Sequence, residues 1–294
     1  MKKTLLLTLV LLVASSSLGQ SNTTDAGTFY DLGNDQLFVR ELGSGDPLVF
    51  LHGGPGDNHE NFMPWGRELA NTHQVILYDQ SGAGQSTFKE KQAYTIEREV
   101  ANLERLRERL NLETMTLVGH SWGSILSLYY AQQYPDRVSR IVLMGSIGTS
   151  YQDYQAFAAN LMSRMTPVIQ SKLMQLQTAE SIDMQAMFQA MLPLYFYDVD
   201  KIKDMSDTQI QFDVQQSIAR QVMLEFDFSK DGAAFTMPIY VVQGEHDPLS
   251  PTLLEERFAT FTNAKVLGIP EAGHWPFVEQ PKATTQAILE LLKN

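Results

Sequence analysis

One short segment near the middle of the chain restricts its fold most strongly. Residues 119–123 read G-x-S-x-G, with Ser121 at the centre and a glycine at each end. The apolar, β-prone residues 115–118 precede this segment, and residues 124–134 follow it with a helical spacing of apolar side chains. Small residues on both sides of a serine permit a very tight turn that lifts the hydroxyl clear of a sheet edge. The segment therefore predicts a strand, a sharp turn at Ser121 and a helix.

Short apolar runs and amphipathic stretches alternate on both sides of this turn. Strands are predicted at residues 48–51, 75–78, 115–118, 141–144, 239–242 and 264–269, and helices at 61–69, 95–110 and 281–292. Residues 29–32 and 37–42 alternate in polarity around a Gly-Asn pair, which predicts an antiparallel hairpin. Strands that alternate with helices indicate the α/β class, with a mostly parallel, doubly wound sheet covered by helices on both faces.

The alternation stops between residues 149 and 235, where only helical stretches are recognisable. This segment holds most of the 13 methionines and the aromatic residues 195–197. We interpret residues 149–235 as an inserted helical cap, and residues 20–148 and 236–294 as the core domain. The methionines and aromatic residues are expected to pack inside the cap or to line a pliable apolar pocket.

The first 19 residues have the character of a signal peptide. Lys2 and Lys3 precede the apolar residues 5–14, and the small residues Ser17 and Gly19 match a cleavage site. The alternative is a membrane anchor, but a spanning helix needs about 20 apolar residues. We predict cleavage after Gly19, export to the periplasm or medium, and no stable membrane insertion of the mature chain.

Composition excludes several kinds of function. The chain has no cysteine, so that disulfides, a cysteine nucleophile and thiolate metal ligands are excluded. Its formal net charge of −12 argues against nucleic acid or an anionic membrane as a partner. A small peptide or another small molecule is the expected substrate.

Ser121 needs a base and an acid to become a nucleophile. In doubly wound hydrolases the three residues follow one another as Ser, acid and His. Asp247 follows the first strand after the cap and is the predicted acid, with Glu245 as its local competitor. His274 follows the last strand and is the predicted base. Of the other five histidines, those at 52, 120 and 246 are explained by the motifs around them, and those at 59 and 73 are expected at the surface.

An oxyanion formed at Ser121 also needs preplaced hydrogen-bond donors. The backbone N–H of Trp122, the residue after the nucleophile, is the first predicted donor. Residues 52–56 read H-G-G-P-G and follow a predicted strand, so their glycines allow the backbone to approach a substrate closely. Gly54 is the predicted second donor, with Gly53 as the alternative donor and as a substrate contact.

These motifs together resemble the α/β-hydrolase superfamily, and within it the proline iminopeptidases. The resemblance rests on H-G-G-P-G at 52–56, D-Q-S-G-A-G-Q-S at 79–86 and G-H-S-W-G at 119–123. It implies removal of N-terminal residues, proline foremost, from small peptides without a metal or cofactor. The chain departs from the family at Ser81, where an arginine is usual, and at Ser124, where a second glycine is common.

The cap departs further, because it lacks the family's tryptophan-rich segment that ends in glutamate and grips the substrate's amine. The three tryptophans of the chain lie elsewhere. A buried ammonium without a carboxylate is costly. Glu225 is therefore the predicted substrate-binding carboxylate, with Asp227 beside it as a second candidate; both can also be ordinary surface residues.

Three functions are compatible with the sequence. The first is an exported serine aminopeptidase that acts through an acyl-enzyme. The second is an esterase or carbon–carbon bond hydrolase for a small apolar substrate, because the cap is rich in methionine and aromatic residues. The third is a ligand-binding protein on a hydrolase scaffold, since a fold alone does not establish a function.

Overall fold

The computed structural model describes residues 26–33, 35–88, 94–178, 181–206 and 208–293, with the side chains of 223–225 left out. The predicted signal peptide lies outside the described residues. Within the described ranges, no helix is both long and apolar enough to cross a membrane.

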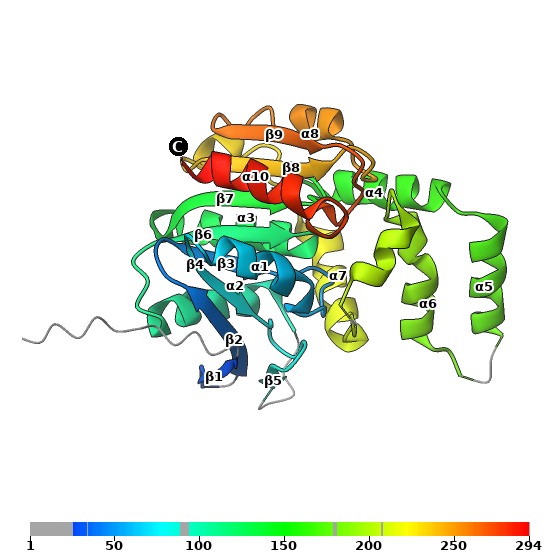
Figure 1. Ribbon diagram of the computed structural model, residues 1–294, viewed down its shortest axis with the longest axis horizontal. Coiled ribbons are helices and arrows are strands. Elements are labelled where there is room, and N and C mark those ends of the chain that lie inside the picture. Colours follow the sequence, from blue (N-terminus) through cyan, green and yellow to red (C-terminus); the bar gives the residue numbers. More distant parts are fainter. Residues whose placement is uncertain (1–25, 34, 89–93, 179–180, 207, 294) are drawn as a thin grey trace, which may run out of the picture.

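A single mixed sheet forms the centre of the molecule (Figure 1). Its strands follow the order β1-β2-β4-β3-β6-β7-β8-β9, and the short β5 pairs with β2. The predicted hairpin of β1 and β2 is confirmed as antiparallel, and all neighbours from β4 to β9 are parallel. The bounds are β1 Thr28–Asp31, β2 Asp35–Gly43, β3 Pro47–Leu51, β4 Gln74–Tyr78, β5 Thr87–Phe88, β6 Met115–His120, β7 Val138–Met144, β8 Ile239–Gly244 and β9 Ala264–Ile269.

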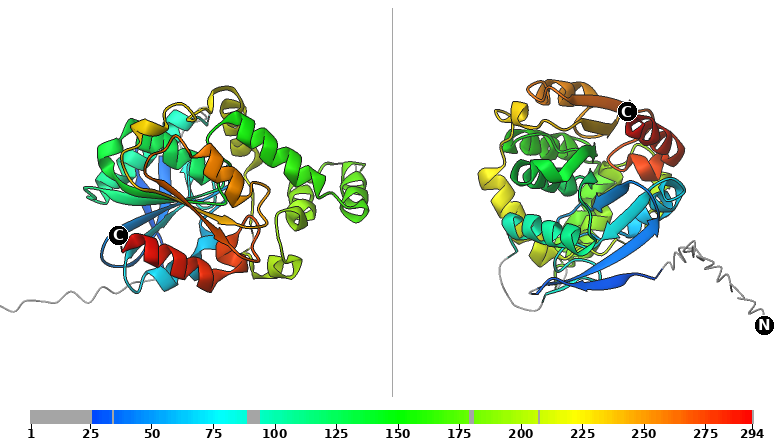
Figure 2. Two further views of the ribbon diagram at one scale, coloured as in Figure 1. Left: turned by 90° about the horizontal axis from the view of Figure 1, so that it is seen from above. Right: turned by 90° about the vertical axis from the view of Figure 1, so that its left-hand side faces the viewer.

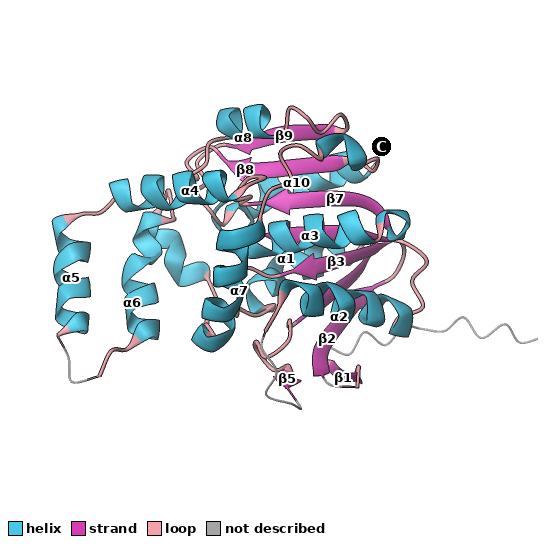
Figure 3. Cartoon of the chain, turned by 180° about the vertical axis from the view of Figure 1, so that it is seen from behind, coloured by secondary structure: helices cyan, strands magenta, loops and turns pink. Residues whose placement is uncertain are grey.

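Helices cover both faces of this sheet (Figures 2 and 3), which confirms the predicted doubly wound α/β architecture. Helices α2, α3 and α8 pack on one face, and α1 and α10 pack together on the other. The bounds are α1 Met63–Leu69, α2 Ile96–Arg109, α3 Trp122–Gln133, α8 Pro251–Arg257, α9 Pro276–Glu279 and α10 Pro281–Leu292. The short α8, α9 and β5 were not predicted.

The central strands are buried on both faces, as their unbroken apolar runs require. In β3, Leu48 and Phe50 pack into the core beside α1 and α10, whereas Val49 and Leu51 pack into the core beside α2 and α3. The carboxyl ends of β3, β6, β7, β8 and β9 consequently meet at one edge of the sheet. Loops that follow these strands are held side by side there.

The described chain between β7 and β8 is helical and lies beyond this edge (Figure 1). Helix α4 begins with a capping box in which Ser150 and Asp153 satisfy each other's backbone N–H groups. Helices α5 and α6 form a pair that projects away from the sheet, and neither contains a buried residue. The bounds are α4 Tyr151–Ser163, α5 Pro167–Gln177, α6 Met184–Met191 and α7 Phe212–Glu225, with 3₁₀ helices at Leu192–Leu194, Val199–Asp204 and Gly232–Ala234. Further 3₁₀ turns lie at Glu60–Phe62 and Pro135–Arg137.

Candidate active site

Ser121 occupies the sharp turn between β6 and α3. Its φ of 54° and ψ of −117° are unusual for a residue with a side chain. A β-carbon on Gly119 would lie 2.2 Å from the Gly123 carbonyl oxygen, and one on Gly123 would lie 2.0 Å from the Leu51 carbonyl oxygen. Both flanking positions therefore require glycine, and helix α3 begins directly after the serine, at Trp122.

His274 and Asp247 are hydrogen-bonded to each other. His274 Nδ1 lies 2.7 Å from Asp247 Oδ2, and both side chains are almost fully buried. The other carboxylate oxygen of Asp247 accepts the Leu249 N–H at 2.8 Å. Both oxygens of Asp247 thus have a partner, and the imidazole is fixed with Nε2 as its free nitrogen.

The competing acid, Glu245, lies elsewhere. Its side chain is exposed at the end of β8 and beside Gly268 of β9. The chain turns between the two acidic residues, and the Asp247 N–H bonds to the Gly244 carbonyl oxygen at 3.0 Å. This turn directs only the second carboxylate inward, to His274.

A small cavity of about 80 Å³ brings Ser121 and His274 together. Its walls come from both the core loops and the cap. The lining residues are Gly53, Gly54, Asp57, His120, Ser121, Phe188, Tyr195, Ile210, Gln215, His274 and Trp275. The predicted serine, histidine and glycine-rich loop therefore border one space, and Asp247 lies behind His274.

Both predicted oxyanion donors lie beside this cavity. Trp122 is the first residue of α3, so its N–H has no acceptor within the helix. A β-carbon on Gly53 would lie 3.2 Å from the Ser121 Cβ, which shows how closely this backbone approaches the serine. Gly54 has a φ of +109°, a conformation that favours glycine.

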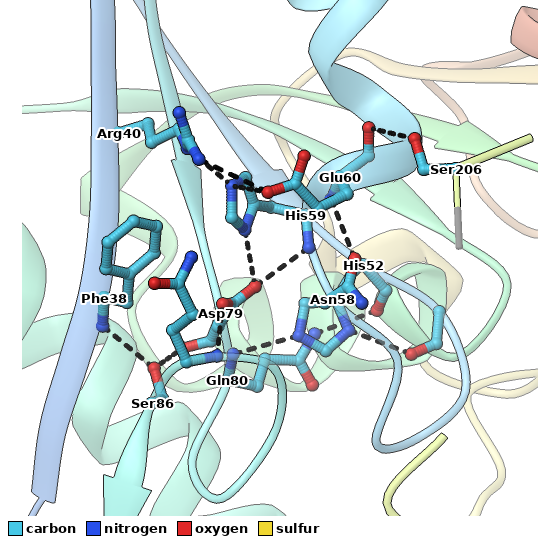
Figure 4. A network of polar contacts seen from close by, with 12 residues as sticks. Phe38, Arg40, His52, Asn58, His59, Glu60, Asp79, Gln80, Ser86 and Ser206 are labelled. Atoms are coloured by element: carbon cyan, nitrogen blue, oxygen red, sulfur yellow. Dashed lines mark hydrogen bonds and ion pairs between the residues drawn. The ribbon is translucent and has the colours of Figure 1, made fainter. Parts of the chain in front are cut away.

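Gln80, from the D-Q-S-G motif, links the two segments that carry these predicted donors, and its contacts with His52 are drawn in Figure 4. Its side-chain oxygen accepts the Trp122 ring N–H at 2.8 Å, and its side-chain amide donates to the His52 carbonyl oxygen at 2.9 Å. Its backbone N–H donates to His52 Nε2 at 2.9 Å. Burial lowers the pKa of His52 to about 4, so the ring is neutral and its Nδ1–H can donate to the Gly53 carbonyl oxygen.

His59 was expected at the surface, and this prediction is wrong. Its ring is buried, and its Nδ1 and backbone N–H both bond to Asp79 Oδ1, at 2.7 and 2.9 Å (Figure 4). Arg40 Nε donates to His59 Nε2 at 2.9 Å. Because Nε2 accepts, Nδ1 carries the proton and donates it to the carboxylate. Asp79, the first residue of the D-Q-S-G motif, thereby holds in place the segment that follows the glycine-rich loop.

A second, larger cavity of about 280 Å³ adjoins the first, and Gly54 and Gln215 line both. Its other lining residues are mainly apolar: Pro55, Trp122, Ile125, Ile147, Tyr154, Gln216, Ala219 and Val222. The cap contributes aromatic residues to the two cavities, as expected, but among the described residues no methionine lines either. Met165 and Met191 pack against the core instead.

Of the two carboxylates predicted to bind an amine, only Asp227 belongs to the described side chains, and it lines neither cavity. The side chain of Glu225 lies outside the described part of the structure. Asp227 is exposed, and its carboxylate accepts bonds from the N–H and hydroxyl of Ser229, which lower its pKa. A solvated loop turn after α7 explains its position better than a role in binding.

The sequence analysis did not include Asp57, which lines the cavity beside Ser121. It directly follows the H-G-G-P-G loop, and only 4% of its surface is exposed. Burial raises its pKa to about 7. The available signal was an acidic residue immediately after a glycine-rich loop that was already assigned to the site.

Comparisons with known proteins place the chain among hydrolases of this fold. The sequence model described as the alpha/beta hydrolase fold matches residues 46–281. A proline iminopeptidase of Lactobacillus delbrueckii subsp. bulgaricus is 26% identical over 275 residues, covering 86% of this chain and 92% of that protein. A 2-hydroxy-6-oxo-2,4-heptadienoate hydrolase of Pseudomonas putida is 37% identical over 125 residues, covering 41% and 44%.

Among solved structures, an esterase from Thermogutta terrifontis superimposes with a TM-score of 0.68 at 22% identity, covering 91% of this chain and 98% of that one. At this identity the superposition establishes a shared fold. The family match over most of the chain and the resemblance to proline iminopeptidases agree with it. The chain belongs to the alpha/beta hydrolase fold family.

Proposed function

We propose that the chain is a serine hydrolase in which Ser121, His274 and Asp247 form the catalytic triad. The observation that carries this proposal is the buried hydrogen bond from His274 to Asp247, at the edge of a cavity that Ser121 also lines. The strained turn at Ser121 supports it, because such backbone strain persists where the surrounding structure requires it.

In the proposed reaction, His274 Nε2 takes the hydroxyl proton while Ser121 Oγ attacks the carbonyl carbon of the substrate. Asp247 holds the ring orientation and stabilises the imidazolium without becoming protonated. The N–H groups of Trp122 and Gly54 stabilise the oxyanion. When the tetrahedral intermediate collapses, the leaving group takes the proton from His274, and water then releases the acyl group by the same route.

The substrate we propose is a small peptide, from which the enzyme releases an N-terminal proline or another small residue. Similarity to a proline iminopeptidase along most of both chains supports this choice. The small volume of the cavity beside Ser121 fits a small N-terminal residue. We also propose export, on the basis of the signal-like residues 1–19.

Proline β-naphthylamide and acetyl-proline β-naphthylamide test the aminopeptidase proposal. We expect turnover of the free-amine substrate and little turnover of the acetylated one. Equal rates on both would contradict a requirement for a free amine. Absence of turnover together with no labelling of Ser121 by a fluorophosphonate probe would contradict the serine hydrolase proposal itself.

A second candidate function is an esterase or carbon–carbon bond hydrolase. The apolar lining of the larger cavity favours it, and so does similarity over 125 residues to the Pseudomonas putida hydrolase. Short-chain p-nitrophenyl esters provide the test. This candidate fails if the wild type hydrolyses them no faster than Ser121→Ala does.

A further inference from the structure

Asp57 is a buried carboxylate with unused hydrogen-bonding capacity beside the catalytic cavity. It lines the same cavity as Ser121 and His274. Its Oδ1 atom is buried and has no hydrogen-bond partner among the residues that the structure describes. The donor to this carboxylate in the described part of the chain is the backbone N–H of the next residue, Asn58.

The other buried carboxylates around the site have hydrogen-bond donors for both of their oxygens. Asp247 accepts from His274 and Leu249, and Asp79 accepts from His59 and Gln85. Glu279 accepts three backbone N–H groups, from Gly273, Tyr197 and Asp198. Glu99 also has an unpaired oxygen, but it lines neither cavity of the site.

An unpaired carboxylate is expensive to bury, since desolvation costs the ionised form far more than one backbone hydrogen bond returns. Nearby charges do not remove this cost, because Asp79 disfavours ionisation of Asp57 and His59 favours it only weakly. A cationic donor that enters the cavity would satisfy the free oxygen and offset the cost. The residue therefore has the properties of a binding group that is complete only when a ligand is present.

We propose that Asp57 is a specificity-determining residue that binds a cationic amine of the substrate next to Ser121. The inference rests on the proposed function and deepens it. The core loop, and not the helical cap, then supplies the carboxylate that selects a free N-terminus. A β-carbon on Gly54, the proposed oxyanion donor, would lie 2.8 Å from the Asp57 backbone nitrogen, so the two residues are close enough for the amine and the reacting carbonyl to belong to one substrate residue.

Asp57→Asn tests the proposal, because it keeps the shape of the side chain and removes the charge. For proline β-naphthylamide we expect kcat/KM to fall about 10- to 100-fold, mainly through KM, as for loss of a charge-assisted hydrogen bond. For acetyl-proline β-naphthylamide we expect no loss. Glu245→Gln is the matched control, since it removes an exposed carboxylate near the same sheet edge and should leave both rates unchanged.

A binding measurement separates this proposal from the proposed function. In a Ser121→Ala background, calorimetry compares prolinamide with N-acetyl-prolinamide, with and without Asp57→Asn. Weaker binding of prolinamide alone in the double variant supports the role of Asp57 even if the wild type cleaves neither naphthylamide. Equal prolinamide binding by both variants, or no prolinamide binding to Ser121→Ala, overturns it. An unchanged ratio of rates for the two naphthylamides also overturns it, even where aminopeptidase activity itself is established.

Discussion

The loops at the carboxyl ends of the strands and the α5–α6 pair of the cap are built in opposite ways. In the loops, Asp247 and His274 are almost fully buried and hydrogen-bonded to each other. In α5, Val168 is 79% exposed and Met174 is 59% exposed, and no residue of this helix is buried. The loops are held by packing and hydrogen bonds, whereas α5 is largely exposed and its partner α6 reaches the cavity beside Ser121 through Phe188.

This difference matches two separate requirements of a hydrolase. Proton transfer and oxyanion stabilisation depend on groups held within fractions of an ångström, so rigid core elements must carry them. Substrate admission tolerates looser packing. The half of the cap next to the core is intermediate: Asn160 of α4 bonds to the Pro248 carbonyl oxygen, and Gln211, just before α7, bonds to the Gly56 carbonyl oxygen.

Among substitutions in the loops, removing the proposed nucleophile should have the largest effect. Ser121→Ala is expected to lower kcat by on the order of 10⁵- to 10⁶-fold, because the acyl-enzyme cannot form. Steady-state assay and fluorophosphonate labelling measure the loss. Unchanged thermal unfolding of the variant is the control. Activity close to that of the wild type would show that the nucleophile is another residue.

Replacing the proposed acid of the triad should have the next largest effect. Asp247→Asn is expected to lower kcat by about 10⁴-fold, because the amide permits the wrong tautomer of His274. Glu245→Gln, two residues away and exposed, should be neutral. If Glu245→Gln abolishes activity and Asp247→Asn does not, the bond between Asp247 and His274 serves structure only.

The positions of Ser121, Asp247 and His274 could be predicted because they depend on local patterns in a fixed order. The glycines at 119 and 123 indicate a turn that has no room for a β-carbon, and the apolar runs indicate the buried strands. Chain order along the sheet then leaves one place for the acid and one for the base. Even α8 had a readable start, since Ser250 caps it and Pro251 begins it, although it was overlooked.

Features that depend on long-range packing could not be predicted in this way. His59 is buried because Asp79, twenty residues later, reaches it across neighbouring loops. The exposed position of Asp227 follows from how the segment after α7 passes over the core. Asp57 looks like an ordinary loop aspartate until its burial and its missing partner are known.

A substitution at Gln80 tests whether the loops that it connects depend on one another for stability and activity. Gln80→Ala removes hydrogen bonds to the Trp122 ring and to His52 and leaves buried polar groups unsatisfied. We expect a loss of about 3 kcal/mol in unfolding free energy. We also expect a fall in kcat greater than any rise in KM, since the segments that carry both proposed oxyanion donors lose support. Denaturant unfolding and steady-state kinetics measure the two effects. Gln133→Ala, at an exposed position, is the control, and equal effects of the two substitutions would argue against a coupled network.

Asp57 should make the stability of the protein depend on pH. Its folded pKa of about 7 lies above the ordinary value of 3.8. Protonation therefore favours the folded state, and stability is lost as pH rises toward and through 7. The charged or titratable groups near it are Asp79, His59, His120 and His274.

Asn cannot ionise, so Asp57→Asn removes this loss. The unfolding free energy of the variant minus that of the wild type should therefore increase by about 2 to 3 kcal/mol as the pH rises from about 5 to about 8. Urea unfolding at both pH values measures the difference. Glu99, whose pKa is also raised to about 7, is present in both proteins and cancels. A difference that does not change with pH would mean that Asp57 is ionised and partnered in the folded protein.

The smallest effect is expected in the cap, where the same valine-to-alanine substitution can be made at a buried position in α7 and at an exposed position in α5. Val222→Ala in α7 truncates a buried residue that lines the larger cavity, and should cost about 1 to 3 kcal/mol of stability and alter KM. Val168→Ala in α5 truncates an exposed side chain, and should change stability by at most about 0.5 kcal/mol with kcat/KM unchanged. Thermal unfolding and kinetics on one substrate compare the two variants directly. A larger change in KM for Val168→Ala than for Val222→Ala would reverse the comparison, because substrate would then have to contact α5 during turnover.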